Sequence, residues 1–320
     1  MYALPKDDLT VFAIDDTDPE AWRFHYVDFD PLRHESFEAP FGGVVLSVTM
    51  NRANDAVWML ARGQLFAASR EMKVAVPLPL PVEGLVSFDV KLIGTRYYIC
   101  ANAETVWYYE RNEERWVPLL TPEPRAPMPP RRDGESSSDY VDRTSPMAYE
   151  YARAHPDLYS SFPVGRDTYF VGALGQVTRL SGERLDTIRL DSGVRLVEGH
   201  EENGVAVISG DDPTAEIYSG TLDNGFERIF QNDIPALHKT AVHRGVRYIG
   251  AALSPDYDGP SLFRLDGEEL IPVATGCDRE PGALVQLVST GAVLWAIDEA
   301  GFFRFTPQGW QLTELADLPA

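Results

Sequence analysis

Runs of carboxylates interrupt the apolar stretches of this 320-residue chain. Three such runs lie in its second half, and a fourth lies near its N-terminus. Grouped carboxylate oxygens can bind a metal cation or attract a basic protein surface. The members are Asp211, Asp212 and Glu216, then Asp256 and Asp258 around Tyr257, then Asp298 and Glu299, and near the N-terminus Asp15, Asp16, Asp18 and Glu20.

The spacing of these residues favours a protein surface over a metal site. Asp256-x-Asp258 offers two carboxylates that could hold Ca²⁺, but no EF-hand pattern surrounds the pair. The six histidines show no zinc-like spacing, and no Cys-x-x-Cys motif exists. The sequence therefore predicts no cofactor, with Ca²⁺ as the alternative.

Motifs for nucleophilic catalysis are missing from the sequence. It contains no Gly-x-Ser-x-Gly elbow, no Ser-x-x-Lys with its partner motifs, and no glycine-rich phosphate loop. Residues distant in sequence can still assemble a catalytic site in space, so enzymatic activity stays open. The pattern leans toward a protein that is not an enzyme.

The elements that must position these carboxylates are clearest near the C-terminus. Apolar runs at 284–289, 293–297, 302–306 and 310–315 are rich in β-branched or aromatic residues. The breaks between them carry Gly, Pro or Asp, which favour turns. This pattern predicts four short strands in a meander.

Similar phrases recur about every 40 residues, which is the length of a four-stranded propeller blade. Full units are predicted at 43–80, 85–120, 158–190, 193–230, 237–274 and 283–315. The sequence therefore predicts an all-β, single-domain β-propeller over 1–320, with six blades favoured and seven possible. Segment 1–42 holds a possible hairpin, 9–14 and 22–29, which would form a partial blade or close the ring.

The phrases AIDEAGFFRFTPQGW and ALGQVTRLSGERL resemble the blade repeats of many bacterial β-propellers. The resemblance is architectural, covers nearly the whole chain and names no single family. No Gly-His begins a unit and no Trp-Asp ends one, so the WD40 signature is missing, as are recurring kelch double glycines and the sialidase Asp-box.

Segment 121–157 interrupts the repeats between the second and third full units, and it is rich in Pro, Ser and charge. Its first half is predicted to be a loop, because it has little apolar surface to bury. A short helix is expected over 147–154, with Ser145 as N-cap and Pro146 in the first position. Tyr140, Tyr149 and Tyr151 could serve there as aromatic anchors for a partner.

Propeller geometry assigns these turns to faces. Strands of a blade alternate in direction, so turns between second and third strands emerge on the same face as the links between blades. The four acidic runs and the insertion are therefore expected on one face, as an acidic arc over about half of the ring. The opposite face would carry a mildly basic rim made of Arg52, Arg96, Arg166, Arg244 and Arg247.

The overall charge narrows the classes of partner. Acidic residues number 49 against 28 basic ones, a net charge of −21. Such a surface repels nucleic acid and anionic membranes, so neither is expected as a partner. No signal peptide and no membrane span is recognised, and Cys100 and Cys277 are expected as free thiols. These features predict a soluble, cytoplasmic protein.

Three functions fit these observations. The first is a non-enzymatic propeller that binds a basic protein through its acidic face, for example a cytoplasmic inhibitor or immunity-type protein that neutralises a toxin or effector domain. The second is a hydrolase resembling calcium-dependent sugar lactonases, which would need an ion in the central channel. The third is a carbohydrate-binding lectin with sugars stacked on exposed aromatic side chains. The net charge and the missing catalytic motifs favour the first.

Overall fold

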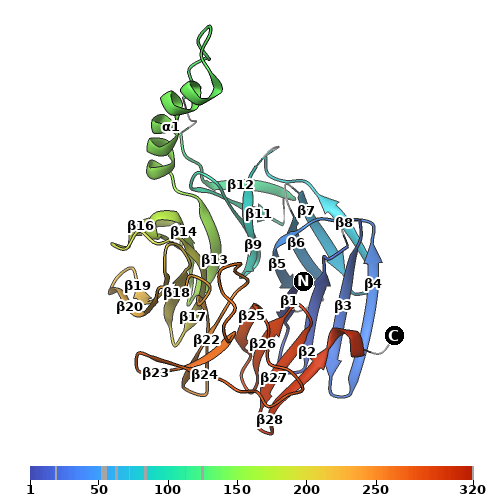
Figure 1. The fold of residues 1–320 in the computed structure, drawn as a ribbon. Coiled ribbons are helices and arrows are strands. Elements are labelled where there is room, and N and C mark those ends of the chain that lie inside the picture. Colours follow the sequence, from blue (N-terminus) through green and yellow to red (C-terminus); the bar gives the residue numbers. More distant parts are fainter. Residues whose placement is uncertain are drawn as a thin grey trace.

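The computed structural model describes residues 1–18, 20–51, 56–61, 64–71, 73–82, 85–111, 113–123 and 126–318. Within these residues the strands form seven four-stranded antiparallel sheets, and each sheet uses four strands that are consecutive in the chain (Figure 1). We number the sheets as blades 1–7 in chain order. The molecule is therefore a β-propeller, as the repeats predict.

The first four blades precede residue 190. Blade 1 contains β1 (Tyr2–Pro5), β2 (Thr10–Asp15), β3 (Trp22–Phe29) and β4 (Leu32–Ala39); blade 2 contains β5 (Val45–Asn51), β6 (Ala56–Ala61), β7 (Gln64–Ser69) and β8 (Val74–Leu78); blade 3 contains β9 (Ser87–Ile93), β10 (Arg96–Ala101), β11 (Thr105–Glu110) and β12 (Arg115–Leu120); blade 4 contains β13 (Leu158–Val164), β14 (Asp167–Gly172), the 3₁₀ turn η1 (Ala173–Gly175), β15 (Gln176–Ser181) and β16 (Arg184–Arg189).

The remaining blades complete the ring. Blade 5 contains β17 (Leu196–Glu202), β18 (Val205–Gly210), β19 (Ala215–Thr221) and β20 (Gly225–Asn232); blade 6 contains β21 (Lys239–His243), β22 (Val246–Gly250), β23 (Leu262–Asp266) and β24 (Glu269–Pro272); blade 7 contains β25 (Leu284–Ser289), β26 (Leu294–Asp298), β27 (Gly301–Thr306) and β28 (Gly309–Glu314), followed by the 3₁₀ turn η2 (Leu315–Asp317).

The ring has seven blades, the alternative that the sequence left open, instead of the six that it favours, because residues 1–42 contain a complete four-stranded blade. The predicted hairpin exists as β2 and β3, and β1 and β4 flank it. Strand β4 lies at the outer edge with most of its side chains exposed, so it lacks the apolar alternation that marks a half-buried strand. Strand β1 has only four residues. Neither strand therefore carries a strong sequence signal.

Apolar clusters between neighbouring blades make the core. Trp22 of blade 1 is fully buried, and its indole meets the Phe66 ring of blade 2 edge-on at a centroid distance of 4.9 Å. Burial of a large aromatic side chain contributes about 2–3 kcal/mol. Between blades 5 and 6, Ile217 packs in one cluster with Ile249. Each blade is therefore held by the faces it shares with its neighbours.

The ring closes by packing between blades 1 and 7, which lie side by side as the blue and red sheets of Figure 1. Each keeps four strands of its own, so the closure uses no strand exchanged between the chain ends. Val11 and Val27 of blade 1 share a cluster with Trp295 and Phe302 of blade 7, all four fully buried. Side-chain packing between blades 1 and 7 therefore closes the ring, without a strand shared between the two ends of the chain.

The insertion contains one helix, α1 (Ser137–Ala154), which begins earlier than the predicted 147–154. Ser136 is its N-cap, and the Ser136 hydroxyl accepts the N–H of Asp139 at 3.0 Å. Ser145 and Pro146 therefore lie inside the helix, where the Ser145 hydroxyl donates to the carbonyl of Val141 at 2.7 Å. No described helix is long and apolar enough to cross a membrane.

Candidate functional site

The turns that carry the acidic runs share one face of the ring. Because the strand order in every sheet follows the sequence, strands alternate in direction. The turn from second to third strand therefore leaves the sheet at the same edge as the link to the next blade. We call this the connector face; it includes residues 16–21, 211–214, 251–261 and 299–300 together with the links between blades.

Asp298 is a structural residue on this face. It is 3% exposed and sits at the end of β26, where its carboxylate accepts the N–H groups of Gly282, Ala300 and Gly301. Arg279 donates two further hydrogen bonds to it. Burial alone would raise the pKa of Asp298, but Arg279 and these donors hold that pKa below its ordinary value. The carboxylate thus organises blade 7 and is closed to a partner.

Glu216 is also buried and hydrogen-bonded within the protein. It is 4% exposed, the Tyr218 hydroxyl donates to its carboxylate, and the Thr214 hydroxyl donates to it at 3.1 Å. Arg228 lies 3.6 Å away as a further cation. The sequence pattern places this glutamate in a turn, whereas the structure places it on β19 with its side chain buried. Its contacts stabilise blade 5.

Three more of the predicted carboxylates order the chain locally. Asp211 pairs with Arg195 through two hydrogen bonds of 2.8 and 3.0 Å. Asp16 binds the amino group of Met1 at 2.8 Å and accepts the N–H of Val45 at 3.1 Å. Asp15 accepts both the N–H and the hydroxyl of Thr17, and although partial burial opposes them, these bonds lower the pKa of Asp15.

The other carboxylates of the arc are exposed to solvent. None of them forms an ion pair within the part of the chain that the structure describes, and they lie in four consecutive blades from 5 through 7 to 1. They are Asp18, Glu20, Asp212, Asp256, Asp258 and Glu299. These six, which we call the free arc, are accessible to a partner.

The aromatic residues predicted as anchors differ in their accessibility. Tyr257 is half-buried and its hydroxyl donates to the carbonyl of Pro260 at 2.6 Å. Tyr140 lies under the guanidinium of Arg143, and the Tyr151 hydroxyl donates to the carbonyl of Glu123 at 3.1 Å. Tyr149 is 70% exposed.

Three of these tyrosines lie on helix α1, away from the acidic turns of blades 6 and 7. In Figure 1 the helix stands out beyond the ring above blade 4, at the top of the view, whereas blades 6 and 7 lie at the bottom. The structure therefore does not bring Tyr140, Tyr149 and Tyr151 together with Asp256, Asp258 or Glu299.

The opposite face is less basic than the arginines in its sequence suggest. Nη2 of Arg247 donates to both carboxylate oxygens of Glu202, at 2.9 and 2.8 Å. Arg96 lies 3.6 Å from Glu110, and Arg244 donates to the carbonyl of Ala292 at 3.2 Å. Arg166 is exposed, and Arg52 lies outside the described residues. Most of the positive charge is therefore already neutralised or engaged.

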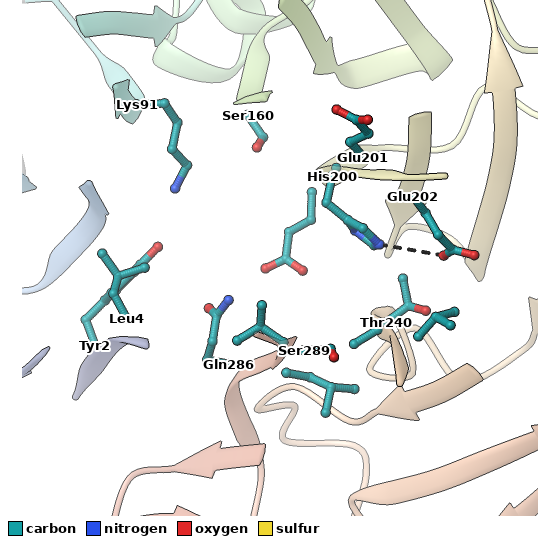
Figure 2. Close-up of a pocket in the computed structure, with 16 residues that line it drawn as sticks. Tyr2, Leu4, Lys91, Ser160, His200, Glu201, Glu202, Thr240, Gln286 and Ser289 are labelled. Atoms are coloured by element: carbon teal, nitrogen blue, oxygen red, sulfur yellow. Dashed lines mark ion pairs between the residues drawn. The ribbon is translucent and has the colours of Figure 1, made fainter. Parts of the chain in front are cut away.

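A cavity of about 300 Å³ lies among the inner strands, by which we mean the first strand of each blade (Figure 2). Lys91 of β9 is on one side of it, and His200, Glu201 and Glu202 of β17 are on the other. Burial disfavours the charged form of Lys91, but Asp89, 3.5 Å away, outweighs this and raises the pKa of Lys91. Sequence reasoning missed this cavity, because its residues are far apart in the chain.

Within the described residues, no group of three or more His, Cys, Asp or Glu side chains is arranged to hold a metal ion. Nε2 of His200 lies 4.0 Å from the Glu202 carboxylate, the contact drawn as a dashed line in Figure 2, and burial lowers the pKa of His200. Cys100 is buried and Cys277 is partly buried, and both are free thiols. The expectation that no cofactor binds stays a prediction.

Comparisons with known proteins identify the fold and no family. No family model matches the chain, and no curated protein matches it significantly. Among solved structures, the WD40 β-propeller domain of Doa1 aligns with a TM-score of 0.59 at 7% identity, over 92% of this chain and 88% of that one. The structure of U3-55K aligns with a TM-score of 0.60 at 12% identity, over 92% and 86%.

The β-propeller domain of Myceliophteria thermophila Cps50 (Swd1) is similar as well, with a TM-score of 0.56 at 10% identity over 92% of this chain and 94% of that one. At such low identities these likenesses carry information on architecture alone. They support the β-propeller fold.

Proposed function

We propose that this protein is a non-enzymatic binding propeller whose connector face holds a basic protein partner, as an inhibitor or immunity-type protein does. The observation that carries the proposal is the free arc, six exposed carboxylates without ion-pair partners among the described residues. They are spread over four consecutive blades of one face. Asp18 accepts the N–H of Glu20 at 2.8 Å, but among the described residues none of the six pairs with an arginine as Asp298 and Asp211 do.

Charge on this face supports docking in two ways. The net charge of −21 attracts a cationic partner at long range, and the free arc orients it toward the connector face. Exposed charges of this kind act mainly on the association rate and on the choice of partner. The connector face also extends over all seven described blades, and a stable interface needs about 800 Å² from each partner.

The test compares two sets of charge-removing substitutions. The first set replaces the free arc by the corresponding amides. The control set makes six equivalent replacements at exposed carboxylates in the turns and strand ends of the opposite face, so the loss of net charge is the same. The control residues are Glu71, Glu114, Glu183, Asp266, Glu268 and Glu269.

Wild type and both variants are used as baits in lysate of the source cells, and retained proteins are identified by mass spectrometry. We expect a basic protein that wild type and the control variant retain, that the free-arc variant loses, and that high salt elutes. If both variants retain it equally, the connector face is not its binding site. Addition of purified wild type to the captured protein then measures whether its activity is inhibited.

A further inference from the structure

Five inner strands share a local irregularity close to the connector face. In β5, β9, β13, β17 and β25 the pairing with the next strand skips one residue directly after the first pair. Such a β-bulge re-aims the extra side chain and ends regular pairing. The five bulged residues are all aliphatic or aromatic: Leu46, Phe88, Tyr159, Val197 and Val285.

Side chains from four successive blades meet as a result. Leu46, Phe88, Tyr159 and Val197, together with Arg195, line a hollow of about 250 Å³. The rings of Phe88 and Tyr159 meet edge-on at a centroid distance of 4.9 Å, and together they form the aromatic wall of this hollow. We call this hollow, defined by its five lining residues, the bulge pocket. Because each bulge follows a link between blades, the bulge pocket opens on the connector face.

The rim of the bulge pocket also exposes apolar surface. Leu46 is 40% exposed, and two valines that directly precede the inner strands, Val44 and Val86, are 65% and 53% exposed. A cluster of exposed aliphatic and aromatic side chains around a hollow is typical of an interaction site. Val76, another exposed apolar residue, lies on β8, the outermost strand of blade 2, at the opposite edge of the sheet from the strand β5 that carries Leu46.

Carboxylates flank the bulge pocket on both sides. Beside Leu46, the turn of blade 1 is tied to β5 by the hydrogen bond from Val45 to Asp16. Beside Val197, the guanidinium of Arg195 pairs with Asp211. The backbone N–H of Arg195 donates to the carbonyl of Asp212 at 2.9 Å. The exposed members of these two turns, Asp18, Glu20 and Asp212, belong to the free arc. The pocket is therefore an apolar hollow in an acidic surround.

We propose that the bulge pocket receives a bulky apolar side chain, Leu or Phe in type, from a partner segment that carries Lys or Arg on both sides of it. This inference rests on the proposed function and adds the chemistry that the partner must present. The apolar wall selects the central side chain, while the free arc selects its basic flanks. Burial of one such side chain strengthens binding by about tenfold to a hundredfold.

The experiment uses two synthetic peptides of equal charge. Each has three basic residues on either side of a central pair, which is Leu-Phe in one peptide and Ser-Ser in the other. Fluorescence anisotropy at low salt gives the Kd of each peptide for wild type, for the double variant Leu46→Ser/Val197→Ser, and for the control Val76→Ser. Leu46 and Val197 are not fully buried, so the double variant is expected to fold.

We expect wild type and V76S to bind the Leu-Phe peptide at least tenfold more tightly than the Ser-Ser peptide. The double variant should bind both peptides with the weaker affinity. Equal affinities of the wild type for the two peptides would overturn the proposal that the bulge pocket receives an apolar side chain. They would leave the proposal of charge-driven docking intact. Failure of both peptides to bind wild type would overturn the proposed function as well.

A second readout locates the bound side chain. Methyl NMR signals of Leu46 and Val197 should shift when wild type is titrated with the Leu-Phe peptide, and those of Val76 should stay in place. Shifts confined to residues outside the bulge pocket would contradict the proposal even if the Leu-Phe peptide binds more tightly.

Discussion

The hydroxyl of Thr290 donates a hydrogen bond of 2.7 Å to the carboxylate of Asp8, across 282 residues of sequence. The same carboxylate accepts the N–H groups of Ala292 at 3.2 Å and Val293 at 3.3 Å. One side chain of the turn after β1 thus binds the whole turn that precedes β26. Since blades 1 and 7 share no strand, this contact and the apolar cluster beside it close the ring.

Asp8→Ala should therefore destabilise the whole propeller. The substitution leaves three donors at the blade junction without their acceptor, and we expect the free energy of unfolding to fall by about 1–3 kcal/mol. Urea denaturation followed by tryptophan fluorescence measures the change. Asp258→Ala, at an exposed carboxylate without an ion pair, is the control and should change stability by less than about 0.5 kcal/mol. Equal effects of the two substitutions would mean that the Asp8 contact does not hold the ring.

Arg279→Ala should destabilise blade 7. The Arg279 side chain bridges the carboxylate of Asp298 and that of Glu314, the last residue of β28. Its removal leaves Asp298 buried and charged with backbone donors alone, which should cost about 3 kcal/mol. Chemical denaturation measures this loss, and Arg279→Lys should restore only part of it because lysine cannot form the paired bonds. A neutral result would show that the backbone N–H groups suffice for Asp298.

Acid should destabilise the protein through His25. Burial first, and then the neighbouring His34, lower the pKa of His25 from 6.5 to about 4, and its Nδ1 lies 2.9 Å from Nε2 of His34. The unfolded chain therefore binds a proton at His25 more readily than the folded one. The contribution of neutral His25 to the free energy of unfolding is therefore fully present above pH 6.5 and is lost as the pH falls toward 4. We expect the free energy of unfolding to fall by about 2 kcal/mol between pH 7.5 and pH 5.

His25→Gln removes this titration and should flatten the stability profile over that interval. Thermal denaturation of wild type and variant at several pH values gives the comparison. Identical slopes for the two proteins would show that His25 does not have the lowered pKa.

The sequence predicts the four strands of blade 7 to within one residue, because apolar runs there alternate with Gly, Pro and Asp turns. The same logic fails for β4, since an outer strand with exposed side chains reads like a loop. Helix α1 is placed too late because Pro146 suggests a helix start, whereas the cap formed by Ser136 and Asp139 is the actual signal.

The candidate site is predictable in its location and less so in its members. Chain order alone assigns the acidic turns to one face, since alternation of strands follows from the meander. Whether a carboxylate is free depends on tertiary neighbours: Asp298 meets Arg279 from the link before its own blade. Leu46 and Phe88 read as ordinary strand residues, because a bulge depends on the register between two strands.

Neutralising the free arc should slow association more than it speeds dissociation. Exposed carboxylates act on an approaching cation over roughly a Debye length, about 8 Å at physiological salt, whereas contacts in the bulge pocket form only after docking. For the Leu-Phe peptide, stopped-flow fluorescence should show an association rate about tenfold or more lower with the free-arc variant at low salt. The dissociation rate should change little, and the difference in association should shrink as salt is added. The control variant, which has the same net charge as the free-arc variant, should associate nearly as fast as wild type. An equal slowing of both variants would instead assign the attraction to net charge, without a directing role for the connector face.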